Sequence, residues 1–188
     1  MRIILASKSP RRKELLSELY SDFEIVVSDA DETLPQGCTP AESAAIIALR
    51  KGVAVAEKVG KEALVISSDT MVELDGVILG KPTSPSDAHQ MLRMLSGRRH
   101  NVHTGVAVCY KGRTFFGTDT TRVEFRELTD IEIDEYIATG EPMDKAGAYG
   151  IQGYAGRFVE GYDGDFDTVV GLSLALTRGL IEEAVKHE

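Results

Sequence analysis

The chain has 188 residues, of which 43% are hydrophobic and 27% charged, a composition typical of one packed globular domain rather than a disordered chain. The formal net charge of −9 argues against a nucleic-acid polymer as partner, because an acidic protein repels the phosphate backbone. No apolar run reaches the roughly 18 residues of a membrane span, and the first residues lack the pattern of a signal peptide, so we expect no membrane partner and a cytoplasmic protein. Neither Cys38 nor Cys109 lies in a Cys-x-x-Cys pair, and we expect both thiols to be reduced.

Strands and capped helices alternate along the first half of the chain, which predicts an α/β fold in a single domain over residues 1–188. Ser9 and Thr39 are placed to cap helices that open on a proline, and Thr39 begins a capping box. The expected elements are a strand over residues 2–6, a helix from residue 10, a strand over 23–27, a helix over 40–59, a strand over 63–66 and a hairpin over 71–79 with a tight turn at 75–76.

The second half continues the alternation of helices and strands. Thr129 begins a second capping box, and residues 144–156 hold four glycines and two tyrosines in a loop-like stretch. The expected elements are a helix from residue 85 to Gly97, strands over 101–110 and 113–125, a helix from the capping box to Gly140, a strand over 157–160 and a final helix over 172–185.

The turn Ser7-Lys8-Ser9-Pro10-Arg11-Arg12 is the first candidate site. It leads into a helix N-terminus, where free N–H groups and the helix dipole favour an anion. Two hydroxyls and three cations add to this, and the planar fork of arginine matches a phosphate edge. Cations at a helix N-terminus oppose the dipole, so their placement favours a phosphate site over a solvated basic turn. The glycines of a Walker loop are absent.

The polar run Ser67-Ser68-Asp69-Thr70 follows the most apolar strand, and we place it at the C-terminal end of that strand. Ligands of open α/β sheets gather at such ends, where a carboxylate can ligate Mg²⁺ or take a proton from water. An aspartate that only begins the next turn fits the spacing equally well, so both interpretations stay open. In the acidic segment after the second strand, Glu32 could share a cation with Asp69, whereas for Asp29 a solvated charge is the better interpretation.

Three further groups of residues are less specific. Lys51 in the long helix and Lys81 in Gly80-Lys81-Pro82 would by default be surface lysines. The segment over 141–153 is rich in small residues that admit a flat base, and Gln152 offers a donor and an acceptor to a base edge. Its charged and aromatic side chains argue against a flexible connector. His100 and His103 would face opposite sides of a strand and make a poor metal pair, and we interpret His100 as a structural hydrogen-bonding residue.

Taken together, six pieces in this order resemble the Maf family of nucleoside triphosphate pyrophosphatases over nearly the whole chain. Each piece alone is moderately specific, whereas the ordered set is very specific. The pieces are Ala6 to Arg12, Asp31-Glu32, Ser68-Asp69-Thr70, Gly80-Lys81-Pro82, Gly97 to His100 with Thr104-Gly105-Val106, and Asp144 to Gly153.

The resemblance implies an elongated α/β protein like the inosine triphosphate pyrophosphatases, with a long twisted mixed sheet flanked by helices and a central cleft between two lobes. It implies hydrolysis of a nucleoside triphosphate between the α and β phosphates, a divalent metal and, commonly, a homodimer. Asp69 matches the family's proton acceptor, and the branch that acts on dTTP and UTP is marked by Arg12, Thr70 and Gln152. On this basis we expect Glu32 and Asp69 to hold Mg²⁺ or Mn²⁺, and the triphosphate to contact Ser7, Arg11, Arg12, Lys51 and Lys81.

The chain departs from the family pattern near its end, where Thr168 and Ser173 stand at positions that usually hold Asn and Pro. This puts the packing of the lobes in question before the activity. The alternative function is a non-catalytic nucleotide-binding regulator of cell division or septum formation, which would need the basic pocket but not the base. A phosphatase that removes only the γ phosphate is a second enzymatic alternative.

Overall fold

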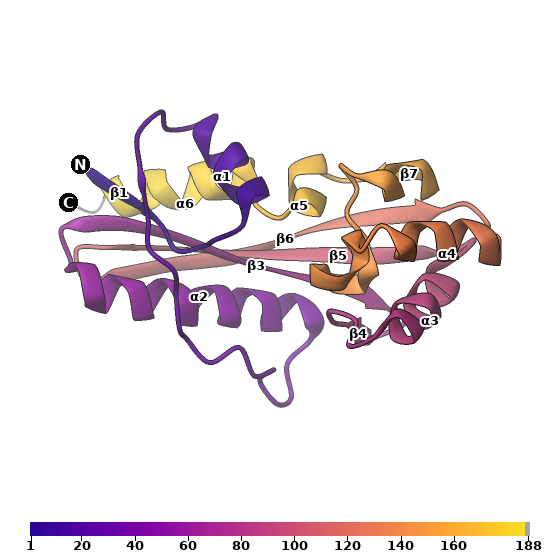
Figure 1. Ribbon diagram of the computed structural model, residues 1–188. Helices are drawn as coiled ribbons and strands as arrows, with labels where there is room; N and C mark the ends of the chain where they lie inside the picture. Colours follow the sequence, from indigo (N-terminus) through magenta and orange to yellow (C-terminus); the bar gives the residue numbers. More distant parts are fainter. Residues whose placement is uncertain (187–188) are drawn as a thin grey trace.

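In the computed structural model, which describes residues 1–186, one mixed sheet runs the length of an elongated molecule (Figure 1). The strands are β1 (Arg2–Leu5), β2 (Glu24–Ile25), β3 (Ala63–Leu74), β4 (Val77–Leu79), β5 (Arg99–Tyr110), β6 (Arg113–Phe125) and β7 (Val159–Asp163). The α-helices are α1 (Pro10–Ser17), α2 (Pro40–Val59), α3 (Pro85–Leu95), α4 (Asp130–Ala138), α5 (Phe166–Val170) and α6 (Leu174–Lys186), and three short 3₁₀ helices cover Glu141–Asp144, Ala146–Ala148 and Tyr154–Phe158. The strand order is β2-β1-β3-β5-β6-β7, with β4 beside β3.

The predicted caps are confirmed. Ser9 caps α1, and both Thr39 and Thr129 form reciprocal capping boxes with the glutamate three residues later. The tight turn of the β3–β4 hairpin is also confirmed, since Asp75 and Gly76 both have positive φ, as a two-residue turn between twisted strands requires. No helix within residues 1–186 is both long and apolar enough to cross a membrane.

The polar run that we placed at a strand end lies instead in the middle of β3, so that prediction was wrong. Residues 65–73 of β3 pair with β5 without interruption. Ser67 Oγ donates to the carbonyl of Ala48 at 2.7 Å, and Ser68 Oγ donates to the carbonyl of Gly171 at 2.8 Å. Because neighbours on both faces of the sheet accept these hydrogen bonds, the strand continues through a sequence that looks like its end.

Several boundaries also differ from the predictions. The second strand is limited to residues 24–25, and the expected strand over 157–160 begins and ends later, at 159–163. The final helix begins at residue 174, and the short helix α5 before it was not predicted. Asp165 caps the N-terminus of α5, and the helix ends at Gly171, which has a φ of 129°. The helix has five residues, too few for a hydrophobic period to appear in the sequence.

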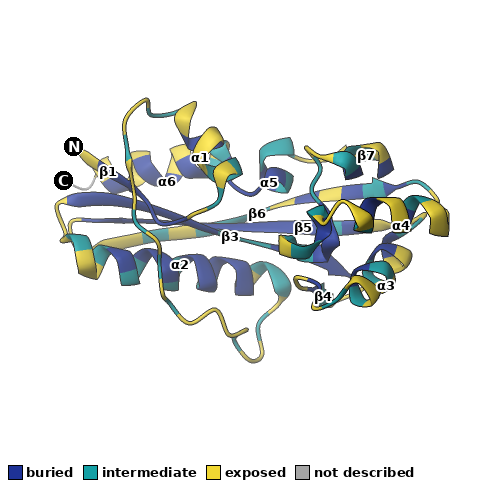
Figure 2. Ribbon diagram, viewed as in Figure 1, coloured by how far each residue is buried: buried dark blue, intermediate teal, exposed yellow. Residues whose placement is uncertain are grey.

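Helices cover the sheet on both sides (Figure 1, Figure 2). Helix α2 lies on one face, and α1, α5 and α6 lie on the other. Successive side chains of β3 alternate between them: Ser67, Asp69 and Met71 point to the side of α2, which we call the α2 face, and Ser68, Thr70 and Val72 point to the opposite side, which we call the α1 face. Neighbouring residues of β3 therefore lie on different faces of the sheet and have different surroundings.

Gly105 on β5 brings α2 close to the sheet. A Cβ atom at this position would lie 2.2 Å from the carbonyl carbon of Ala44, so only glycine lets the helix backbone rest directly on the strand. Gly52 plays the same part on the helix, since a Cβ there would lie 2.7 Å from Ser67 Oγ. This close approach sets the height of Lys51 above the sheet.

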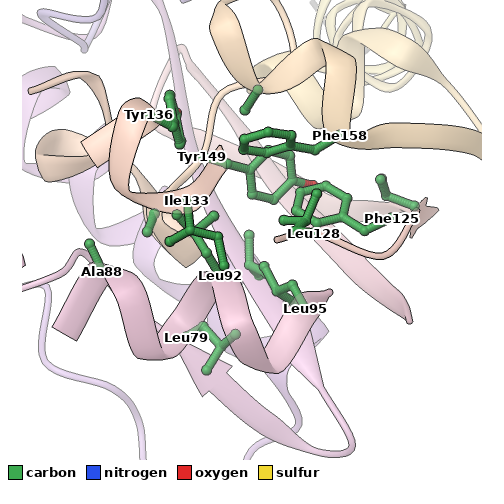
Figure 3. Packing of buried hydrophobic residues seen from close by; sticks show 14 of the residues in the cluster. Leu79, Ala88, Leu92, Leu95, Phe125, Leu128, Ile133, Tyr136, Tyr149 and Phe158 are labelled. Carbon is green, nitrogen blue, oxygen red and sulfur yellow. The ribbon is translucent and has the colours of Figure 1, made fainter. Parts of the chain in front are cut away.

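Two apolar cores lie on the α1 side, one at each end of the molecule. The first joins β1, β3, α1 and α6. The second lies under α3 and α4 (Figure 3), and its labelled side chains are Leu79, Ala88, Leu92, Leu95, Phe125, Leu128, Ile133, Tyr136, Tyr149 and Phe158. At its centre His100 meets Phe125 edge to face at 5.1 Å and lies 2.7 Å from the hydroxyl of Tyr149, so its predicted structural role is confirmed.

The sheet has an opening between these two lobes. β1 pairs with residues 63–66 of β3, and β4 pairs with residues 72–74 on the same side. Among the described residues, 67–71 thus have a strand partner only on the β5 side. The polar run lies at this gap, where one edge of the strand has no strand partner.

Candidate active site

Asp69, Lys51 and Glu32 meet on the α2 face. Lys51 Nζ lies 2.6 Å from Asp69 Oδ1 and 3.2 Å from Glu32 Oε2. Lys51 is only 9% exposed, whereas the side chain of Glu32 is 60% exposed, so the cluster runs from a buried lysine to solvent. The surface position that Lys51 would have by default does not hold, because Gly52 and Gly105 let α2 place this ammonium group directly over β3. Its expected contact with the triphosphate stays a prediction.

The segment that carries Glu32 is held against α2. Arg50 donates to the carbonyl of Thr33 at 2.7 Å, and Asp31 Oδ1 accepts the backbone N–H of Thr33 at 2.9 Å in a local turn. Asp29 forms an exposed ion pair with Lys58 at 2.7 Å, away from Lys51, in agreement with its interpretation as a solvated charge. These contacts leave Glu32 as the acidic residue of this segment that reaches the cluster.

The donor set of the cluster suits a hard divalent cation that also binds a substrate. The carboxylates of Glu32 and Asp69 both lie within 3.2 Å of one nitrogen, so their oxygens converge. Among residues 1–186 there is no group of three or more His, Cys, Asp or Glu side chains that could hold a metal. Mg²⁺ typically takes one or two carboxylates and completes its shell with water and substrate phosphates, so two converging carboxylates fit this mode.

Arg12 lies on the α1 face, beside the gap in the sheet. Its Nε donates to the carbonyl of Gly171 at 2.9 Å and its Nη1 to the carbonyl of Ser68 at 2.8 Å, and its Nη2 donates to Thr70 Oγ1 at 3.2 Å. Burial lowers the pKa of this guanidinium group, while the nearby charges of Asp69 and Glu32 act in the opposite direction. Three of its five N–H groups are thus bound to the protein, and Arg12 serves first to join α1, β3 and the end of α5.

A cavity of about 60 Å³ lies beside Arg12 and between the lobes. This exceeds the roughly 10–15 Å³ that a single water requires, so the cavity admits a larger group. Thr70 forms part of one wall, and the other wall comes from the glycine-rich segment. The lining residues are Arg11, Arg12, Thr70, Val72, Val102, Ala146, Tyr149, Gly150, Ile151, Gln152, Val169 and Val170.

The glycine-rich segment is built against β3 rather than free. Gly147 has a φ of 66°, and a Cβ atom there would lie 2.8 Å from Val72 Cγ1. Its backbone N–H donates to the carbonyl of Gly80 at 3.0 Å, which brings the Gly80-Lys81-Pro82 turn beside the segment. Gln152 is exposed at the cavity, and its side chain makes no hydrogen bond with a described residue.

The other predicted phosphate-binding residues surround this region. Ser7 is buried, and its Oγ accepts the backbone N–H of Ser9 at 3.2 Å, which shapes the turn into α1. Arg11 lines the cavity next to Arg12. Lys81 is exposed and makes no ion pair within residues 1–186, so its ammonium group is available to a ligand. The structure thus gathers Glu32, Lys51 and Asp69 on one face and Arg11, Arg12, Thr70 and Gln152 on the other, with Ser7 and Lys81 near the gap.

Part of the site was not visible in the sequence. The carbonyls of Ser68 and Gly171 hold Arg12, and backbone groups leave no side-chain pattern. Gly105 belongs to the motif Thr104-Gly105-Val106, but its spacing alone gives no sign that a helix rests on it.

The two departures from the family pattern form one polar cluster. Thr168 Oγ1 and Ser173 Oγ donate to the same oxygen of Asp119 at 2.8 Å and 2.7 Å. Both residues are fully buried, and their hydroxyls tie α5 and the residue before α6 to Asp119 on β6. The buried hydroxyl groups at both departures from the family pattern therefore have hydrogen-bond partners.

Comparisons with known proteins agree with this architecture. A family model described as "Maf-like protein" matches residues 2–184. A dTTP/UTP pyrophosphatase of Bacillus cytotoxicus is 49% identical over 174 residues, which cover 93% of this chain and 91% of the relative. A dTTP/UTP pyrophosphatase of Thermococcus gammatolerans is 49% identical over 180 residues, which cover 96% of this chain and 95% of the relative.

A solved structure shares the fold. The Staphylococcus aureus Ham1 protein superposes with a TM-score of 0.52 at 18% identity, over 100% of this chain and 95% of that one. At that identity the likeness concerns the fold alone.

Proposed function

The chain belongs to the Maf family, and from this premise we propose that it hydrolyses dTTP and UTP to the nucleoside monophosphate and pyrophosphate. The observation that carries this proposal is the cluster on the α2 face. A carboxylate held by a buried lysine at the open edge of β3 is suited to activate a water molecule beside a bound triphosphate.

Asp69 is the proposed proton acceptor. Its Oδ1 accepts a hydrogen bond from Lys51 at 2.6 Å, and no hydrogen bond from a described residue reaches its Oδ2. Lys51 therefore fixes the orientation of the carboxylate and leaves one oxygen for a water molecule. As that water attacks the α phosphorus, its proton passes to Asp69, the bond from phosphorus to the bridging oxygen breaks, and pyrophosphate leaves with the bond electrons.

Local cations offset the negative charge of the protein. The net charge of −9 would repel a triphosphate, so binding requires positive groups at the site. Lys51, Lys81 and Arg11 are proposed to neutralise the phosphates, and Ser7 to donate its hydroxyl proton at the helix N-terminus. Arg12 adds charge nearby, although most of its N–H groups hold the protein together.

A divalent cation, Mg²⁺ or Mn²⁺, is proposed to be held by Glu32 and Asp69, and when bound it would supply positive charge to the phosphate oxygens. The support is the convergence of the two carboxylates on Lys51.

The cavity on the α1 face is proposed to read the pyrimidine. Arg12, Thr70 and Gln152 line it together, so the residues that mark the dTTP and UTP branch all face one cavity. Catalysis and base recognition thus lie on opposite faces of β3, and the bound nucleotide would extend around the open edge of this strand.

The setting of the reaction is proposed on coarser grounds. Cys38 and Cys109 are both free thiols, as in proteins of reducing compartments, which supports a cytoplasmic location. A homodimer stays a prediction from the family resemblance, and so does the expectation of neither a nucleic-acid nor a membrane partner.

The test is to incubate the purified protein with dTTP, UTP, CTP, ATP and GTP in the presence of Mg²⁺, and to measure pyrophosphate and orthophosphate separately. We expect pyrophosphate from dTTP and UTP, and little from the purine nucleotides. Orthophosphate with a nucleoside diphosphate would indicate a γ-phosphatase instead. Tight binding of dTTP without any product would indicate the regulator.

A further inference from the structure

Thr104 lies behind Thr70 and has no place in the reaction described above. It belongs to β5 and stands directly opposite Thr70 in the register of the β3–β5 pair. Its side chain is fully buried, whereas that of Thr70 is half-buried and lines the cavity. Thr104 therefore cannot touch a nucleotide itself, and any effect on the substrate must act through Thr70.

The hydroxyl of Thr104 has one proton, and that proton is already used. Thr104 Oγ1 lies 2.7 Å from the backbone carbonyl of Thr168, which can only accept. The oxygen atoms of Thr70 and Thr104 are 2.9 Å apart, so one of the two hydroxyls donates to the other. Since the proton of Thr104 points to Thr168, the donor in this pair is Thr70.

The hydroxyl of Thr70 is thereby limited to accepting. Its proton points to Thr104, and one of its lone pairs receives Arg12 Nη2 at 3.2 Å. A hydroxyl offers one donor and two acceptor sites, so a single lone pair remains for the cavity. Arginine cannot accept in place of donating, and the carbonyl of Thr168 cannot donate, so both ends of this chain of hydrogen bonds have a fixed polarity.

We propose that Thr104 is a positioning residue for substrate specificity, which holds Thr70 as a pure hydrogen-bond acceptor so that the cavity selects pyrimidines carrying an N–H at ring position 3. Uracil and thymine have a proton on N3, whereas cytosine has a lone pair there. A cytosine in the same pose would set a lone pair against the lone pair of Thr70. The inference rests on the proposed function, because it assumes that the base occupies this cavity.

Gln152 cannot impose this selection alone. Its amide carries an acceptor and donors, and no described residue holds it in one orientation, so it can turn to suit either base. Thr70 has no such freedom while Thr104 accepts its proton. The polarity of the pocket is accordingly set one strand away from the ligand.

The experiment compares kcat/KM for UTP with kcat/KM for CTP in Thr104→Val and in the wild type. Valine keeps the shape but removes the acceptor, so the proton of Thr70 becomes free to face the cavity. We expect the ratio of UTP to CTP to fall about tenfold, the factor that corresponds to one neutral hydrogen bond. Thr104→Ser restores the hydroxyl, and we expect it to restore the ratio.

Thr177→Val is the matched control. Thr177 is also fully buried, and its Oγ1 donates to a backbone carbonyl, that of Ser173, at 2.6 Å in α6. Both valine variants remove one buried hydroxyl that donates to a backbone carbonyl. The carbonyl of Ser173 keeps the backbone N–H of Thr177 at 2.9 Å, so Thr177→Val should lose no more stability than Thr104→Val. Only Thr104→Val should change the nucleotide ratio, because Thr177 has no contact with Thr70.

Three results would overturn the inference. One is a wild-type enzyme that cleaves UTP and CTP equally well, which needs no variant to establish. Another is an equal loss for both nucleotides in Thr104→Val, as expected if Thr70 contacts the sugar. The third is an unchanged ratio in that variant. If the wild type releases no pyrophosphate, the proposed function fails, and the ratio of equilibrium dissociation constants for UTP and CTP tests Thr104 separately.

Discussion

The two faces of β3 differ in how they use the same kind of strand. On the α2 face, Asp69 meets the buried ammonium group of Lys51 at 2.6 Å, in a charged cluster that opens to solvent through Glu32. On the α1 face, the hydroxyl of Thr70 and the backbone carbonyl of Ser68 accept hydrogen bonds from Arg12 and hold it beside a small cavity. In the proposed function, the first face supplies the charged groups for hydrolysis and the second supplies fixed hydrogen-bonding groups for the base.

The difference shows how adjacent residues can be given separate tasks. Side chains of a strand alternate between faces, so Asp69 and Thr70 differ in environment although they are neighbours in sequence. The gap in strand pairing over residues 67–71 joins the two environments around one edge. Changes on the α2 face should therefore alter kcat, and changes on the α1 face should alter KM and base selectivity.

The largest effect is expected for Asp69→Asn. The amide cannot take a proton from water, so kcat for dTTP should fall about a thousandfold. The dissociation constant of dTTP should change far less than kcat, through the loss of one proposed ligand of the cation. Pyrophosphate release and equilibrium binding measure the two quantities. Asp29→Asn is the control, since Asp29 is an exposed partner of Lys58, and it should retain kcat within about twofold. Normal turnover by the Asp69 variant would remove this residue from the mechanism.

Acid should weaken the α1 face through His100. Burial lowers the pKa of His100 to about 4, against an ordinary value of 6.5. Between these pH values the unfolded chain binds a proton that the folded protein excludes, so the free energy of unfolding falls as the pH drops from 6.5 toward 4. The loss should reach about 3 kcal/mol. Tyr149, which is hydrogen-bonded to His100, lines the cavity. Recognition of the base should therefore weaken as the fold loses stability.

Urea unfolding at pH 7 and pH 4 checks this loss. His100→Gln should lose less stability than the wild type over that interval, by about the same 3 kcal/mol. His89→Gln is the control, because His89 lies at the surface between α3 and α4, where its Nδ1 is 3.0 Å from Asp134. An identical pH dependence for His100→Gln and the wild type would show that His100 does not resist protonation.

Lys51→Met tests the α2 face by removing the ammonium group of Lys51. The substitution leaves Asp69 and Glu32 without the ammonium group between them, and removes a charge from the phosphates. We expect kcat/KM for dTTP to fall about a hundredfold. Lys58→Met, two turns along the same helix, removes only an exposed ion pair and should change kcat/KM less than twofold. Equal effects of the two variants would contradict a special place for Lys51.

Arg12→Lys should give the smallest effect on activity, and this effect should appear in KM rather than in kcat. Lysine keeps the charge, but a single ammonium group cannot reach the carbonyls of Ser68 and Gly171 and the hydroxyl of Thr70 together. We expect KM for dTTP to rise about tenfold with kcat within threefold of the wild type. Arg2→Lys, which alters an exposed ion pair between Arg2 on β1 and Glu24 on β2, serves as the control. A fall in kcat without a change in KM would erase the proposed division between the faces.

Much of this protein could be predicted from short stretches of sequence. The caps at Ser9, Thr39 and Thr129, the turn at Asp75-Gly76 and the α/β alternation were confirmed, and the ordered motifs led to the family that the comparisons show. The elongated mixed sheet was confirmed as well. These features depend on contacts within a few residues or on patterns of residue type, which a sequence displays directly.

The course of β3, the burial of Lys51 and the polarity of Thr70 were decided by the tertiary structure alone. Ser67 and Ser68 remain in the strand because Ala48 and Gly171 accept their protons, and Lys51 reaches Asp69 because Gly105 lets α2 rest on the sheet. Each of these depends on a backbone group or a missing side chain brought from more than a dozen residues away. The sequence by itself determined the residue types of the proposed site and their order along the chain. The fold decided which of them meet, since hydrogen bonds and close packing join partners that the linear pattern keeps apart.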